Sequence, residues 1–205
     1  MNFVRRRLVI TLAAAPWLAP LTAFAQQSPP YLELNPPLPV ESQGKVEVLE
    51  FFTYGCIHCY NLEPRIETWL KTAPKDVEFR RVPAVFNQRM AHDAAIFYAF
   101  DAMGVLDKLH RPFFDAIHRD RLRSDVAQSL NPWLEKNGVD PKKFEGVVKS
   151  FGVQSKAKRA IRLTTDYRID GTPAMAVHGR YMVPAGEGMF ETVNQLVASV
   201  RKNSK

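Results

Sequence analysis

The sequence predicts an α/β fold in which an all-helical segment interrupts a domain that contains a β-sheet. An apolar, strand-like run at residues 46–53 is followed almost at once by a C-x-x-C pair. Helical periodicity replaces strand-like runs from residue 87 to residue 153, and strands return after Gly171-Thr172-Pro173. Strands on both sides of a block of helices indicate a sheet domain with a helical insertion.

Residues 1–25 have the features of a secretory signal peptide. Arginines at positions 5–7 form a basic region, residues 8–21 are mostly apolar, and Ala23-Phe24-Ala25 is a small-x-small cleavage site. An uncleaved membrane anchor is the alternative, but prolines interrupt an apolar run that is short for a bilayer. Twin-arginine export is a second alternative, although the rest of that signal is missing. We therefore expect general secretory export and cleavage after Ala25.

Composition argues against several function classes. The 205 residues carry a formal net charge of +7, and the arginines of the expected leader contribute part of it. The sequence has no dense cluster of basic residues interleaved with aromatic ones, so we expect no nucleic-acid binding. The basic residues between positions 156 and 162 fit the solvated face of a helix. No second long apolar run follows the leader, so we expect a soluble exported protein.

Cys56 and Cys59 are the two cysteines of the chain. A disulfide between residues three apart constrains the unfolded chain little, so stabilisation is a poor reason for the pair. A zinc site would need further ligands, and the sequence has no second C-x-x-C and no His-x-x-x-His. Redox chemistry is therefore the leading interpretation, ahead of a metal site or a structural disulfide.

Residues 26–86 are expected to form the first part of the sheet domain. Residues 46–53 are apolar on both faces, as a central strand covered by helices should be. Tyr54-Gly55 turns the chain, and Cys56 begins a helix that extends toward Leu70. Free backbone N–H groups at that helix start stabilise an anion and lower the pKa of the Cys56 thiol, while Cys59 lies one turn further in and should be more shielded. A second strand is expected at 77–82.

The helical insertion is assigned to residues 87–153. Apolar residues predict one helix that ends near Gly104 and another at 106–117, and their aromatic side chains are expected in a core. Asp140-Pro141 is an N-cap followed by proline at the first helical position, and Gly152 is a candidate terminator.

Residues 154–205 are expected to return the chain to the sheet domain. A connecting helix is predicted at 154–167, followed by strands at 174–177 and 180–183 around a turn at His178-Gly179. A final helix is expected at 189–201.

Three blocks of this sequence resemble the DsbA family of periplasmic thiol–disulfide oxidases. They are Leu49-Glu50-Phe51-Phe52, Cys56-Ile57-His58-Cys59-Tyr60 and Gly171-Thr172-Pro173-Ala174, in the family's order and separated by the helical segment. The resemblance implies a thioredoxin-like fold with an inserted all-helical domain, and a periplasmic location. Ile57 departs from the proline of the best-known members, and this position helps to set the strength of the oxidant.

The resemblance also implies roles for individual residues. Cys56 is the nucleophilic member of a redox-active disulfide with Cys59, and Pro173 belongs to a cis-proline loop that lies against the pair, although most X–Pro bonds are trans. The Thr172 backbone is expected to bind an extended substrate strand and its hydroxyl to approach Cys56, unless it is simply the residue before a strand.

Two charged or titratable residues beside the pair have competing interpretations. His58 either tunes the Cys56 thiolate electrostatically or faces solvent without a role. Glu50 is an acidic residue in an apolar strand, where an unpartnered carboxylate is costly. It either lies at an exposed sheet edge or serves as a proton acceptor or water-holding group beneath Cys59.

A net oxidase is the favoured function, with reduced exported proteins as substrates. The family resemblance implies a quinone-linked membrane partner, a DsbB-like reoxidase, and we expect no cofactor and a monomer. A disulfide isomerase or reductase is the alternative. Periplasmic isomerases usually carry a separate dimerisation domain, and only about 20 residues separate Ala25 from the first strand, which disfavours this alternative. A non-enzymatic metal-binding module is a third possibility.

Overall fold

A computed structural model describes residues 29–203 of the chain. The predicted leader and its cleavage site lie outside these residues. Among residues 29–203, no helix is both long enough and apolar enough to cross a bilayer.

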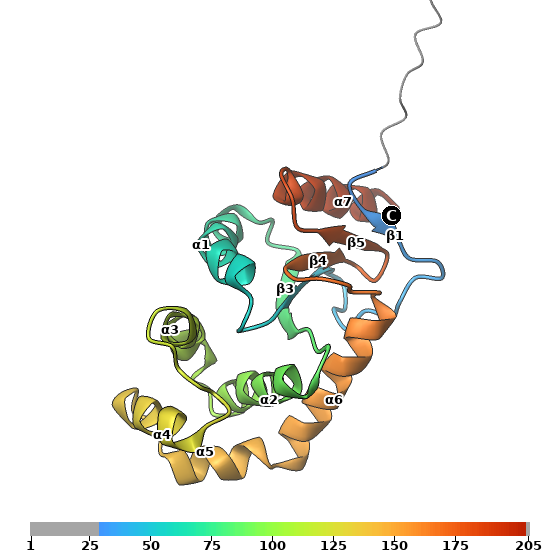
Figure 1. Cartoon of the computed structure of the whole chain (residues 1–205). Helices are drawn as coiled ribbons and strands as arrows, with labels where there is room; N and C mark the ends of the chain where they lie inside the picture. Colours follow the sequence, from blue (N-terminus) through green and yellow to red (C-terminus); the bar gives the residue numbers. More distant parts are fainter. Residues whose placement is uncertain (1–28, 204–205) are drawn as a thin grey trace, which may run out of the picture.

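A five-stranded mixed sheet, in the order β1-β5-β4-β2-β3, forms the centre of the sheet domain (Figure 1). The strands are β1 (Leu32–Glu33), β2 (Val46–Phe52), β3 (Val77–Pro83), β4 (Ala174–Val177) and β5 (Tyr181–Pro184). All seven residues of β2 are buried, and β2 pairs in parallel with β3 and antiparallel with β4. The α/β class and the central apolar strand are therefore confirmed, and the short strand β1 is an element that the sequence analysis missed.

Two helices complete the sheet domain, and five more separate β3 from β4. Helices α1 (Ile57–Thr72) and α7 (Met189–Asn203) share an apolar core with β2, β4 and β5. The helices between the strands are α2 (Gln88–Ala102), α3 (Leu106–His118), α4 (Ala127–Lys136), α5 (Pro141–Val148) and α6 (Phe151–Asp166). Figure 1 shows α2 to α5 gathered on one side, with α6 leading back to the sheet.

The aromatic residues of the helical segment form a core, as predicted. Phe100, Phe113 and Phe114 are fully buried. Phe113 packs edge to face against Phe100 and Tyr54, and Phe114 packs edge to face against His110. The same apolar cluster includes Phe52 at the end of β2 and Cys59 in α1. The helical segment therefore packs directly against the base of the C-x-x-C pair, because one continuous core joins them.

Two details of the helical segment differ from the sequence expectation. Gly152 does not end a helix: it lies in the first turn of α6, which begins at Phe151. Ser150 is the N-cap, and its side chain accepts a hydrogen bond from the backbone N–H of Val153. Helix α4 was not predicted from the sequence. The Asp140 N-cap is confirmed, since its carboxylate accepts a 2.6 Å hydrogen bond from the backbone N–H of Lys143.

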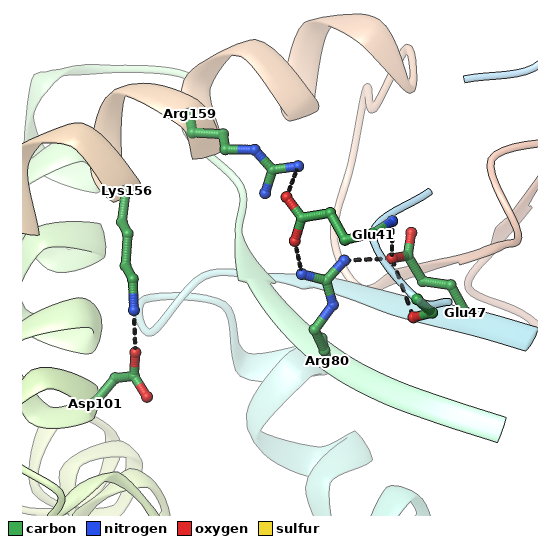
Figure 2. A network of polar contacts seen from close by, with 7 residues as sticks. Glu41, Glu47, Arg80, Asp101, Lys156 and Arg159 are labelled. Carbon is green, nitrogen blue, oxygen red and sulfur yellow. Dashed lines mark hydrogen bonds and ion pairs between the residues drawn. The ribbon is translucent and has the colours of Figure 1, made fainter. Parts of the chain in front are cut away.

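A chain of ion pairs joins α6 to the sheet (Figure 2). Glu41, in the segment before β2, pairs with Arg80 of β3 and with Arg159 of α6. Arg80 also pairs with the buried Glu47 of β2, and Lys156 reaches Asp101 of α2 at 2.7 Å. These contacts give the returning helix a defined position beside the edge strand, although partly exposed pairs stabilise a fold only weakly.

The turn between β4 and β5 places Gly179 at a backbone conformation that an L side chain rarely adopts. Its φ is +66°, and a Cβ atom there would overlap the backbone carbonyl of Leu38. We expect Gly179→Ala to lower the free energy of unfolding by roughly 2–4 kcal/mol, because steric overlap adds to left-handed strain. Gly44→Ala is the matched control: its φ is +71° but no atom lies within 4 Å, so only about 1–2 kcal/mol should be lost. Equal losses in urea titrations would contradict the steric argument.

Candidate active site

Cys56 occupies the N-cap of α1. Its backbone is extended, and its Sγ accepts a 3.3 Å hydrogen bond from the backbone N–H of Cys59. Unpaired N–H groups and the helix dipole both favour negative charge at this position. Cys56 is half-buried, Cys59 is 0% exposed, and both are free thiols. The predicted contrast between an accessible and a shielded cysteine is therefore confirmed.

The loop before β4 lies against Cys56. The Thr172–Pro173 peptide bond is cis, as the family resemblance implied. Cys56 Sγ lies 3.3 Å from the backbone carbonyl of Thr172, to which the protonated thiol donates. This contact follows from the sheet order: Ala174 pairs with Phe51 of β2, so the residues just before β4 meet those just after β2.

The two cysteine thiols have opposite acidities. The pKa of Cys56 is lowered from 9.0 to about 5, chiefly by a hydrogen bond from the Cys59 thiol. The Thr172 side chain and the backbone N–H groups of Cys59 and His58 add to this, while burial opposes it. The pKa of Cys59 is raised, because its thiol donates to Cys56 and because it is buried. The Cys56 thiol is therefore the more acidic thiol of the reduced pair.

The two residues between the cysteines are both exposed. Ile57 is 48% exposed and adds an apolar surface beside Cys56. The His58 side chain makes no hydrogen bond or ion pair with another residue in the described part of the chain, and its backbone N–H is the group that acts on Cys56. Electrostatic tuning by the His58 imidazole remains a prediction.

Glu50 does not lie at an exposed edge, because β2 is the fourth of five strands and Glu50 is 0% exposed. Its Oε2 lies 3.2 Å from Arg81 Nε, at the aligned position of the parallel strand β3. Burial, followed by the negative charge of Glu63, raises the pKa of Glu50 to about 8, although Arg81 opposes this. Glu63 is one helical turn beyond Cys59 on the buried face of α1. Arg81 contacts both Glu63 and Glu50, so the two acids lie close together on the inner side of the cysteine helix.

Helix α3 holds the turn that precedes Cys56. His118 Nε2 donates a 2.8 Å hydrogen bond to the backbone carbonyl of Tyr54, and its ring stacks on Tyr60. The Tyr54 hydroxyl is 2.9 Å from His110 Nδ1. The helical segment thus positions the turn before Cys56 by binding both the backbone and the side chain of Tyr54.

The match to known proteins identifies the family. The profile described as the DSBA-like thioredoxin domain matches residues 47–197, which include the cysteine pair, the helical segment and the cis-proline loop. The chain belongs to this family. Its fold is the thioredoxin-like DsbA fold.

Relatives and solved structures agree with this assignment. A protein of Bordetella parapertussis named thiol:disulfide interchange protein DsbA is 43% identical over 207 residues, covering 98% of each chain. One of the same name from Pseudomonas aeruginosa is 35% identical over 187 residues, covering 88% of each. The crystal structure of Pseudomonas aeruginosa DsbA has a TM-score of 0.77 and 33% identity, covering 85% of this chain and 94% of that one. DsbA from Xylella fastidiosa has a TM-score of 0.78 and 31% identity, covering 84% and 95%.

Several residues of this DsbA-family site escaped the sequence analysis. Arg81 and His110 have no motif around them, and only the parallel register of β2 and β3 and the packing of α3 bring them to Glu50 and Glu63. Glu63 follows Cys59 by four residues and lies on the buried face of α1 and not at the helix surface. Among the described residues, no group of three or more His, Cys, Asp and Glu side chains is arranged to hold a metal ion.

The lowered Cys56 pKa makes the stability of the reduced protein depend on pH. The folded-state pKa of about 5 lies below the unfolded value near 9, so unfolding takes up a proton between these pH values. The resulting stabilisation is fully present above pH 9 and is lost as pH falls toward 5. We expect the free energy of unfolding of the reduced form, measured relative to that of the oxidised form in urea titrations, to decrease steadily as the pH is lowered from 9 to 5. The oxidised form lacks the thiolate, so a constant difference would contradict the assignment.

Proposed function

We propose that this chain oxidises newly exported proteins by donating a disulfide between Cys56 and Cys59. The chain is a thiol:disulfide oxidoreductase of the DsbA family. The observation that carries the oxidase proposal is the set of hydrogen bonds that converge on Cys56 Sγ and lower its pKa to about 5. A stabilised thiolate favours the reduced enzyme, which makes its disulfide a stronger oxidant.

The proposed reaction has two exchange steps. A substrate thiolate attacks Cys56 Sγ, a mixed disulfide forms, and the bond to Cys59 breaks with its electron pair on the Cys59 sulfur. A second substrate thiolate then attacks the substrate sulfur of the mixed disulfide and releases Cys56 as a thiolate. Two substrate thiols become one disulfide, and the enzyme disulfide becomes two reduced cysteines.

Cys59 needs a proton when it leaves, because its pKa is raised in the buried site. We assign this proton exchange to Glu50, which is buried on the inner side of α1 and whose pKa of about 8 keeps it protonated at neutral pH. The carboxylic acid gives a proton when the enzyme is reduced, and the carboxylate accepts one when the enzyme is reoxidised.

The remaining site residues have positioning roles in this proposal. The cis-proline loop presents the Thr172 backbone next to Cys56, where an extended substrate strand can pair with it. Ile57 offers an apolar contact to unfolded segments, and a protonated His58 imidazole adds a positive charge close to the Cys56 thiolate.

The proposed setting is the periplasm, reached through the signal peptide 1–25. Reduced exported proteins are the substrates, a quinone-linked DsbB-like membrane protein is the reoxidant, and the enzyme acts as a monomer. We divide the mature chain into a thioredoxin-like domain, residues 26–86 and 154–205, and a helical domain, residues 87–153. An isomerase or reductase would use the same chemistry with a more stable disulfide.

The reduction potential of the Cys56–Cys59 pair separates these functions. We expect a value more oxidising than about −180 mV, the potential of protein disulfide isomerase, because several hydrogen bonds stabilise the Cys56 thiolate. Equilibration in glutathione buffers followed by thiol counting after acid quenching gives the value. A potential near thioredoxin's, about −270 mV, would make the protein a reductase. His58→Leu, measured alongside, should make the pair less oxidising if its imidazole acts on Cys56.

Replacing each cysteine in turn tests which of the two forms the mixed disulfide with the substrate. We expect Cys59→Ser to retain a reactive Cys56 and to accumulate mixed disulfides with a model substrate that carries a disulfide, because the Cys56 thiolate attacks that disulfide and the internal resolving thiol is missing. Cys56→Ser should lose substrate oxidation entirely. Non-reducing gels and mass spectrometry identify the adducts. Trapping in Cys56→Ser and none in Cys59→Ser would reverse the assigned roles.

A further inference from the structure

His110 lies in a buried polar cluster beneath the cysteine helix. The residue is 6% exposed and comes from α3, in the middle of the helical segment. Its Nε2 is 3.2 Å from Glu63 Oε1, and its Nδ1 is 2.9 Å from the Tyr54 hydroxyl. One imidazole therefore bridges the turn before Cys56 to a carboxyl group in the cysteine helix.

The two partners decide the tautomer of His110. Burial is the first cause of its lowered pKa, so the imidazole is neutral and carries one N–H. The ionised carboxylate of Glu63 can only accept, so the N–H must be on Nε2. The other nitrogen, Nδ1, then accepts from the Tyr54 hydroxyl. Every polar atom of the bridge is satisfied in this arrangement.

The buried carboxyl groups of Glu63 and Glu50 differ in the number of hydrogen bonds that they accept. Glu63 accepts from His110 Nε2 and from two nitrogens of Arg81, at 2.9 and 3.3 Å. Neither oxygen of Glu50 has a hydrogen-bond partner among the described residues, although Arg81 Nε lies 3.2 Å away. Hydrogen bonds to a carboxylate stabilise its ionised form, and two adjacent carboxylates resist ionising together.

We propose that His110 is a positioning residue that assigns the proton between these two acids. It holds Glu63 as the carboxylate that neutralises Arg81, and this leaves Glu50 as the acid that gains and loses a proton. The role of that proton at Cys59 rests on the function proposed above.

The charged groups around the cluster come from every neighbouring element. Arg81 of β3 faces both acids, and Tyr54 lies over His110 from the turn before α1. Asp93 of α2 acts on Tyr54, and Arg111 of α3 acts on His110. Of these groups, His110 alone donates to Glu63 without also approaching Glu50, so it can distinguish the two acids.

Two amide substitutions isolate the donor to Glu63. His110→Gln places its amide nitrogen near the Nε2 position and should keep that donor, whereas the shorter His110→Asn reaches only toward Tyr54. Tyr54→Phe removes the hydroxyl on the other side of the ring and leaves the hydrogen bond to Glu63 in place, so it is a control for loosened packing. His110→Leu removes both contacts.

The titration of Glu50 gives the direct measurement. Carbon-13 NMR of the glutamate carboxyl groups in the reduced protein, with Glu50→Gln for assignment, should show Glu50 titrating near pH 8. In His110→Asn and His110→Leu we expect this midpoint to fall by about one pH unit or more, because Glu63 then shares the proton and Arg81 turns to Glu50. His110→Gln and Tyr54→Phe should retain it. An unchanged midpoint in His110→Asn overturns the proposal.

A kinetic measurement separates this inference from the proposed function. The rate at which Cys59 resolves a mixed disulfide at Cys56 is recorded against pH for the same variants. A kinetic midpoint that moves with the Glu50 titration in His110→Asn supports both proposals. If the NMR midpoint moves while the kinetic profile stays, the His110 assignment holds and proton exchange by Glu50 is wrong.

Discussion

The hydrogen bonds that converge on Cys56 Sγ are the interaction on which the rest of this structure depends. They come from the start of α1, from the Cys59 thiol and from Thr172. Each requires a different part of the fold: a helix that begins at Cys56, a buried second cysteine, and a loop delivered by a strand adjacent to β2. The sheet order and the position of α1 therefore matter chiefly because they bring these donors to one sulfur atom.

The low pKa of the Cys56 thiol is linked to the high pKa of the buried Cys59 thiol. Cys59 stabilises the Cys56 thiolate by donating to it, and it leaves the disulfide as a strong base in an apolar core. In the proposed reaction, one of the two acids beneath α1 supplies the proton that Cys59 takes up. The pKa of Glu50 is raised and that of Glu63 is lowered, so Glu50 is the acid that can carry this proton at neutral pH.

The helical segment is joined to the site more closely than a covering lid would be. Helix α3 contributes His118 to the backbone of Tyr54 and His110 to its side chain, so changes in the packing of α3 reach the residues before Cys56 directly. The ion pairs of Glu41 with Arg80 and Arg159 also connect α6 to β3. The sheet and the helices thus behave as one structure around the cysteine pair.

Local pattern was sufficient to predict the central strand, the helix at Cys56, the Asp140 cap and the identity of the reactive pair, because each depends on neighbours in sequence. It was insufficient for Gly152, where the stronger N-cap of Ser150 starts α6 earlier and a glycine is tolerated in the first turn.

Glu50 was predicted as an acid of interest, but its partners were not. Arg81 reaches it through the parallel register of β2 and β3, and His110 reaches Glu63 through the packing of α3. The sequence alone determined which atoms exchange disulfides, since two cysteines three residues apart at a helix start define that chemistry. Only the tertiary structure decided which acid carries the proton, because a buried group's charge state depends on donors that distant segments bring to it.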